Sequence, residues 1–138
     1  MAARGTRTAD AEGHYFPPNQ PWPRRCYQLG QAICKAVEAF PGDTRVGIIA
    51  SGGLSHFVVD EDFDRAILKA CVEKDANFLQ TLPRNKLHSG NSEILNWVGV
   101  AGAVEHLDLN WFEYVPGYRT PAGRDRSQFC KLGLARFI

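Results

Sequence analysis

A histidine closes a glycine-containing loop near the middle of the chain, residues 51–56 (SGGLSH). The loop directly follows residues 45–50 (RVGIIA), whose β-branched side chains predict a buried strand. A strand fixes the position of the loop that follows it, and Gly52 and Gly53 lack the Cβ atoms that would keep a ligand away from the backbone. Because imidazole titrates near neutral pH, His56 is a candidate for acid–base chemistry. The alternative is a histidine that only makes hydrogen bonds within the fold.

A carboxylate, Glu93, belongs to the second segment that could carry chemistry. Residues 89–103 are predicted to form a helix, and Glu93 falls in its first or second turn beside an apolar stripe. That stripe consists of Ile94, Trp97, Val98 and Ala101. By position alone, Glu93 is a carboxylate that complements the positive end of the helix.

Four motifs stand in a fixed order around the loop of His56, and one of them contains Glu93. They are residues 15–21 (YFPPNQP), 25–30 (RCYQLG), 89–94 (SGNSEI) with Trp97, and 118–123 (YRTPAG). Together with the SGGLSH loop, this ordered set resembles the LigB-type (class III) extradiol ring-cleaving dioxygenases, the superfamily of protocatechuate 4,5-dioxygenase β subunits and gallate dioxygenases. The resemblance runs from about Tyr15 to Gly123.

The resemblance implies a role for individual residues. In this family, two histidines and one carboxylate hold Fe(II) on one face, which leaves positions for an aromatic substrate with vicinal hydroxyls and for O2. The histidine of the glycine loop is the family's acid–base catalyst, which places that role on His56. A glutamate four residues before a tryptophan is an iron ligand, which places that role on Glu93. Asn19 and Arg119 are candidates for contacts with polar groups of the substrate, and the alternative for both is a structural role in loops and ion pairs.

The chain departs from the family pattern at two places. The other two iron ligands of the family are histidines that precede the PPNQP segment, and this chain begins almost at that segment. The chain is therefore expected to represent the C-terminal half of the domain. Residues 124–128 (RDRSQ) replace the Gly/Thr-rich turn that usually follows the last motif.

Two hypotheses of different classes stay open. The first is an Fe(II)-dependent extradiol dioxygenase, or part of one, that cleaves a catechol- or gallate-like ring with O2. The second is a noncatalytic truncated or interaction subunit that keeps the fold but lacks the two histidine ligands.

The remaining histidines and the cysteines are expected to have ordinary structural roles. A histidine in a loop is more often solvated than bound to a metal, and cysteines without close pairs are more often small buried residues of a reducing compartment than zinc ligands. These residues are His14, His88 and His106, and Cys26, Cys34, Cys71 and Cys130.

Composition bounds the class of protein. The chain has 138 residues, 44% of them hydrophobic, which suits one globular unit over residues 14–138 after a polar leader at residues 1–13. A formal net charge of +1 and the absence of a basic run argue against a nucleic-acid partner. No apolar stretch approaches the ~20 residues that span a bilayer, so no membrane partner is predicted and the cytoplasm is the expected location.

The pattern of apolar residues predicts an incomplete α/β domain. A helix is expected from Pro23 to about Phe40, with a buried face of Cys26, Leu29, Ile33, Val37 and Phe40. Further helices are expected after the capping residues Asp60 and Asp75, and further strands over residues 109–115 and 132–138. These strands and helices are too few to cover both faces of the small sheet and to pair its edge strands. The sheet flanked by helices is therefore predicted to be part of a larger LigB-like α/β domain. We therefore expect a homo-oligomer or a complementary subunit.

Overall fold

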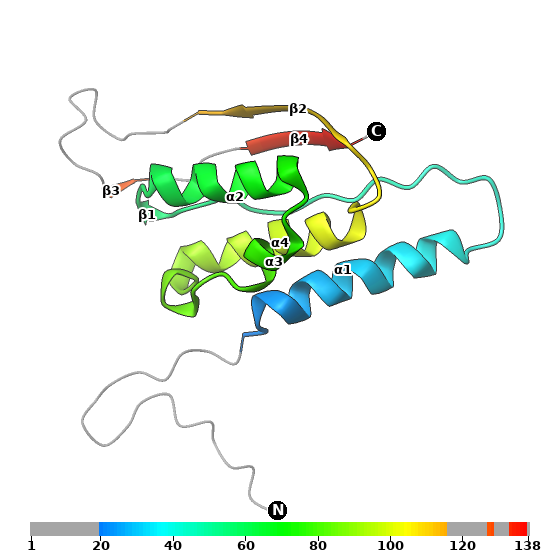
Figure 1. Ribbon diagram of the computed structural model, residues 1–138, viewed down its shortest axis with the longest axis horizontal. Helices are drawn as coiled ribbons and strands as arrows, with labels where there is room; N and C mark the ends of the chain where they lie inside the picture. Colours follow the sequence, from blue (N-terminus) through cyan, green and yellow to red (C-terminus); the bar gives the residue numbers. More distant parts are fainter. Residues whose placement is uncertain (1–19, 116–126, 129–132, 138) are drawn as a thin grey trace, which may run out of the picture.

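The computed structural model describes residues 20–115, 127–128 and 133–137, and these form a helix-rich mixed structure (Figure 1). Its elements in chain order are α1 (Pro23–Glu38), β1 (Phe57–Val58), α2 (Glu61–Glu73), α3 (Ala76–Gln80), the 3-10 helices η1 (Arg84–Lys86) and η2 (Ser89–Glu93), α4 (Ile94–Ala103), β2 (Leu109–Tyr114), β3 (Ser127–Gln128) and β4 (Gly133–Phe137). The predicted polar leader, residues 1–13, lies outside the described residues.

Helix α1 begins and ends where the sequence predicts. Pro23 occupies the first turn, where its missing N–H is not needed, and Trp22 precedes it in an extended conformation. The helix ends at Glu38, and the N–H of Ala39 still donates to the carbonyl of Lys35 at 3.0 Å. The sequence Pro41-Gly42 then prevents a continuation.

The predicted buried face of α1 is largely wrong. The buried residues are Pro23, Cys26, Tyr27 and Gly30, whereas Leu29 is 61% exposed and Phe40 is 64% exposed. Helix α1 packs against α4 through this other, narrower face near its N-terminal end. The apolar stripe that the sequence predicts is real, but no described residue covers it, because periodicity identifies an apolar face and not its partner.

Helices α2 and α3 confirm their predicted caps. The side chain of Asp60 accepts a hydrogen bond from the Phe63 N–H at 3.1 Å, and that of Asp75 accepts one from the Phe78 N–H at 2.9 Å. The predicted inner side of α2 is buried: Phe63, Ile67, Ala70 and Cys71.

The predicted helix over residues 89–103 is divided into two parts. A 3-10 segment, η2, carries Glu93 as its last residue, and the α-helix α4 begins at Ile94. The apolar stripe of Ile94, Trp97, Val98 and Ala101 is buried, as predicted. It contributes to one core together with the inner side of α2 and with Leu54, Leu79 and Leu87.

The strands form two separate antiparallel pairs. Strand β1 pairs with β3, and β2 pairs with β4, with Tyr114 opposite Gly133 and Leu109 opposite Phe137. In Figure 1 the β2–β4 pair lies along one side of the helices, next to α2, and α1 lies on the opposite side. The two predicted strands near the C-terminal end are confirmed within the described residues, whereas one small sheet flanked by helices is not.

The predicted buried strand at residues 45–50 is wrong. This segment belongs to no strand of the described structure. Residues 45–49 are exposed, with Ile49 at 85%, whereas Ala50 is partly buried against the core. A β-branched run becomes a buried strand only where neighbouring strands pair with it and other layers cover its faces. None of the described strands pairs with it. In the part of the chain that the structure describes, no helix is both long and apolar enough to cross a membrane.

Candidate active site around His56 and Glu93

The loop at residues 51–56 meets the η2–α4 segment, so that the predicted acid–base histidine and the predicted iron-ligating glutamate come together. The Nε2 atom of His56 lies 3.0 Å from the Oε2 atom of Glu93. The two residues are distant in the sequence, because α2, α3, η1 and most of η2 lie between them.

Two glycines make this approach possible, one on each side of the contact. A Cβ atom added at Gly52 would lie 2.4 Å from Glu93 Oε2, and one added at Gly90 would lie 2.5 Å from the Cβ atom of His56. Gly52 also has a φ of +122°, which side-chain-bearing residues rarely adopt. The sequence suggested that the missing Cβ atom of Gly52 makes room for a ligand, but in the structure it makes room for the carboxylate of Glu93.

Hydrogen bonds hold the two segments in register. The N–H of Gly53 donates to Glu93 Oε2 at 2.7 Å, and the indole Nε1–H of Trp97 donates to the Gly52 carbonyl at 3.1 Å. The side-chain oxygen of Asn91 accepts from the His56 N–H at 2.5 Å. Because these bonds run between the loop and η2–α4 in both directions, neither His56 nor Glu93 can move far without breaking several of them.

A buried aspartate holds the loop from the other side. Asp64, on α2, is fully buried and accepts hydrogen bonds from the N–H and the hydroxyl of Ser55, at 2.9 and 2.8 Å. The hydroxyl of Tyr114, on β2, also donates to Asp64, at 2.9 Å. Burial, and then this hydrogen bond to a carboxylate, raises the pKa of Tyr114. The residue before His56 is therefore tied to α2 and β2 by a buried polar network.

The backbone directly after His56 is strained. Phe57 has a φ of +62°, in the left-handed region that costs a bulky residue on the order of 1–3 kcal/mol. Such conformations persist only where the surroundings enforce them, and they cluster at functional sites. Here the hydrogen bonds of His56 to Asn91 and of Ser55 to Asp64 hold the residues before Phe57 in place and so enforce its conformation.

The donor atoms at this place fit one carboxylate ligand of a metal ion. Glu93 Oε2 is anchored by the Gly53 N–H, while Oε1 accepts no hydrogen bond from any described residue, and the side chain is 40% exposed. The Nε2 atom of His56 is buried and, despite its short distance from Glu93, forms no well-aligned hydrogen bond within the described part of the chain. An imidazole nitrogen with an unused hydrogen-bonding position beside an anchored carboxylate suits proton transfer next to a metal.

The described structure does not test the other two predicted site residues. Asn19 and Arg119, the candidates for substrate contacts, lie outside the described residues. His88 is exposed. A cavity of about 10 Å³, only as large as a single water needs, is lined by Tyr27, Cys71 and Glu105 among others, and neither His56 nor Glu93 lines it.

Sequence reasoning missed two residues that build the site, Asp64 and Asn91. A signal for Asp64 was present, because it stands between Phe63 and Ile67 on the inner side of α2, where an unpaired carboxylate would be costly. No comparable signal marks Asn91, since an asparagine beside a glycine is common in any loop.

Comparisons with known proteins identify the family of the chain. A family model described as the catalytic LigB subunit of aromatic ring-opening dioxygenase matches residues 17–108. A gallate dioxygenase from Pseudomonas putida is 54% identical over 93 residues, which are 66% of this chain and 26% of that enzyme. The chain thus spans about a quarter of the length of this relative. Since the family model covers more than half of the chain, the chain belongs to the LigB family of aromatic ring-opening dioxygenases.

Proposed function

We propose that this chain contributes the acid–base histidine and one iron-ligating carboxylate to an extradiol dioxygenase that opens a catechol- or gallate-like ring with Fe(II) and O2. The observation that carries the proposal is the placement of His56 Nε2 at 3.0 Å from Glu93 Oε2, on two segments held together by hydrogen bonds. Family membership and the identity with a gallate dioxygenase support it.

In this proposal, His56 and Glu93 have different roles. His56 would accept a proton from a ring hydroxyl of the substrate and return a proton later in the reaction, because imidazole does both near neutral pH. Glu93 would hold Fe(II) through its exposed carboxylate, while the Gly53 N–H keeps that carboxylate oriented. The iron, when bound, would supply the site at which the substrate oxygens and O2 meet.

The remaining two ligands of the family's iron site are expected from polypeptide other than the residues that the structure describes. The described residues place one carboxylate and one imidazole here, and the imidazole has the acid–base role in this proposal. A second function is favoured by that same observation: a noncatalytic subunit that keeps the fold and binds another polypeptide without holding iron.

Iron analysis of the chain alone tests whether its own residues are enough to hold Fe(II). One carboxylate competes poorly with water for Fe(II), so we predict that the chain alone neither retains stoichiometric iron nor consumes O2 with protocatechuate or gallate. Anaerobic iron loading, metal analysis and an oxygen electrode measure both. Stoichiometric iron together with ring cleavage by the chain alone would contradict the assignment of its ligands.

Variants in an assembly that also contains polypeptide with the other two iron ligands would then test each residue. Glu93→Gln should lose iron, whereas His56→Gln should retain iron and lower kcat by about 10²–10⁴-fold, the usual contribution of general acid–base catalysis. His88→Gln is the matched control, because His88 is an exposed histidine outside the site. An assembly that binds no iron and shows no turnover, with all variants folded, would favour the noncatalytic subunit.

A further inference from the structure

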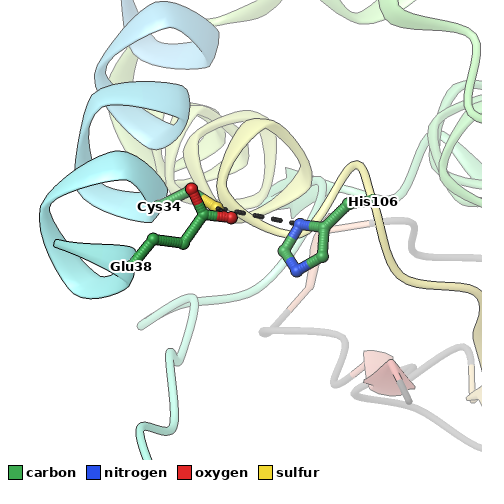
Figure 2. A group of neighbouring side chains, drawn as sticks. All are labelled: Cys34, Glu38 and His106. Atoms are coloured by element: carbon green, nitrogen blue, oxygen red, sulfur yellow. Dashed lines mark hydrogen bonds between the residues drawn. The ribbon is translucent and has the colours of Figure 1, made fainter. Parts of the chain in front are cut away.

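Three side chains with metal-binding donor atoms meet at a place that the proposed dioxygenase chemistry does not use. Cys34 and Glu38 lie one turn apart near the C-terminal end of α1, and His106 lies in the turn that follows α4 (Figure 2). Their donor atoms, one from each side chain, all lie within 4.8 Å of one another. None of these residues belongs to the His56–Glu93 site.

The distances agree with the spacing of ligands around one tetrahedral ion. Cys34 Sγ lies 3.6 Å from Glu38 Oε1 and 3.7 Å from His106 Nδ1. Bonds of about 2.3 Å to sulfur and about 2.0–2.1 Å to nitrogen or oxygen separate tetrahedral ligands by about 3.6 Å. Figure 2 shows the Glu38 carboxylate over the Cys34 sulfur, with the His106 ring beside them and a dashed line from the sulfur to the ring nitrogen. Glu38 is exposed and can adjust by rotation of its side chain.

The fold itself keeps these donors together. Tyr27 Oη donates to Glu105 Oε2 at 2.9 Å, and Gln31 Nε2 donates to the same carboxylate at 3.1 Å. These bonds join α1 to the residue before His106. The turn is closed by a hydrogen bond from the Leu107 N–H to the Val104 carbonyl at 2.8 Å. A metal at this place would therefore meet ligands whose backbone is already positioned.

The charges around the thiol favour a cation. The carboxylates of Glu38 and Glu105 act electrostatically on the Cys34 side chain, while the charge of Lys35 acts in the opposite direction. A thiolate beside two carboxylates is costly without a counter-ion, and a bound divalent cation would supply the missing positive charge.

We propose that Cys34, Glu38 and His106 form a binding site for Zn²⁺ or a divalent cation of similar chemistry. The mixed sulfur, nitrogen and oxygen donors select this class over Mg²⁺ and Ca²⁺, which prefer oxygen ligands throughout. Three protein ligands leave the fourth tetrahedral position for water. The bound ion would link the last turn of α1 to the turn after α4.

The test is a zinc titration of the whole 138-residue chain under reducing conditions, followed by calorimetry, with Mg²⁺ as the comparison cation. We expect one Zn²⁺ per chain and no binding of Mg²⁺ at the same concentration. Cys34→Ser, Glu38→Gln and His106→Gln should each weaken Zn²⁺ binding by at least about tenfold, because each removes one of three protein ligands.

Two controls and one spectroscopic readout make the outcome specific. His88→Gln removes an exposed histidine outside the cluster, and Glu93→Gln removes the proposed iron ligand, so both should leave Zn²⁺ affinity unchanged. With Co²⁺ as the probe, a sulfur-to-metal charge-transfer band should appear in the unsubstituted chain and disappear in Cys34→Ser. Equal Zn²⁺ affinity in the unsubstituted chain and the three cluster variants, or loss of binding in Glu93→Gln, would overturn the proposal. Neither result depends on the proposed dioxygenase activity.

Discussion

At the scale of single residues, the contact between His56 and Glu93 depends on what is missing from two neighbours. Gly90 lies against the His56 side chain and Gly52 against the Glu93 carboxylate, so each functional side chain occupies the space that a Cβ atom of the opposite segment would take. The proposed acid–base group and the proposed iron ligand are thus positioned by glycines, which have no side chain of their own.

Gly90→Ala should displace His56. The new Cβ atom would lie 2.5 Å from His56 Cβ and 2.7 Å from Cγ, so the loop and η2 must move apart. We expect the free energy of unfolding to fall by about 1–3 kcal/mol, the usual cost of inserting an atom into a well-packed site. Chemical denaturation measures the change.

Gly47→Ala is the control for this substitution, because a Cβ atom added at Gly47 meets no atom within 4 Å. Its free energy of unfolding should stay close to that of the unsubstituted chain. Equal stability of Gly90→Ala and Gly47→Ala would show that the two segments do not approach one another as closely as the structure has them.

At the scale of secondary-structure elements, α1 and α4 approach so closely that their backbones touch. A Cβ atom added at Gly102 would lie 2.2 Å from the Tyr27 carbonyl oxygen, and one added at Gly30 would lie 1.9 Å from the Gly99 carbonyl oxygen. Backbone atoms cannot rotate away as side chains do, so these two glycines set the separation of the helices.

Gly102→Ala and Gly99→Ala should therefore have opposite effects. Gly102→Ala forces α1 and α4 apart and should lower the free energy of unfolding by about 1–3 kcal/mol. Gly99→Ala places its Cβ atom 3.7 Å from the Cys26 carbonyl oxygen, an ordinary contact, and alanine is favoured over glycine within a helix by about 0.8–1.0 kcal/mol. Thermal or chemical unfolding of the pair measures the difference, and similar destabilisation by both would contradict the helix contact.

The link between α1 and the turn after α4 predicts a loss of stability at alkaline pH. Burial, and then the hydrogen bond to Glu105, raises the pKa of Tyr27 from 10.0 to about 12. The folded state therefore holds the phenol proton more tightly than the unfolded state does. The stabilisation is fully present below pH 10 and is lost as the pH rises towards 12.

Tyr27→Phe should flatten this decline, because it removes the group that titrates. The free energy of unfolding, measured at intervals from pH 9 to about 12, should fall less steeply in the variant. Tyr114, whose pKa is also raised, contributes to the decline that remains. Identical pH dependence in the variant and the unsubstituted chain would exclude Tyr27 as a source.

At the scale of the whole molecule, apolar side chains on α1 and the segment that follows it are exposed, with no described residue covering them. Leu29 is 61% exposed, Phe40 is 64% exposed and Ile49 is 85% exposed. Monomeric proteins rarely leave extended apolar patches exposed to water. This observation agrees with the expectation of a homo-oligomer or a complementary subunit, which stays a prediction.

We predict that the chain alone self-associates through this surface. Leu29→Glu combined with Ile49→Glu should reduce the apparent mass in light scattering at high concentration, since two charges would have to be buried on association. Val72→Glu is the control, because Val72 is an exposed apolar residue on a different helix, α2. A compact monomer of the unsubstituted chain at high concentration would contradict the prediction.

Much of the local structure could be predicted from the sequence, because local signals determine it. The caps at Asp60 and Asp75, the start of α1 at Pro23 and the buried stripe of α4 all depend on residues within a few positions of one another. The pairing of His56 with Glu93 followed from motifs shared with a family and not from periodicity.

Only the tertiary structure decided which apolar faces are covered and what completes the site. The stripe of Leu29 and Phe40 and the run at residues 45–50 look like core in the sequence, yet they are exposed, because burial depends on a partner surface that one segment cannot specify. The roles of Asp64, Gly52 and Gly90 depend on contacts with segments distant in the chain. So does the meeting of Cys34 and Glu38 with His106, for which the sequence shows only a cysteine and a glutamate one helical turn apart.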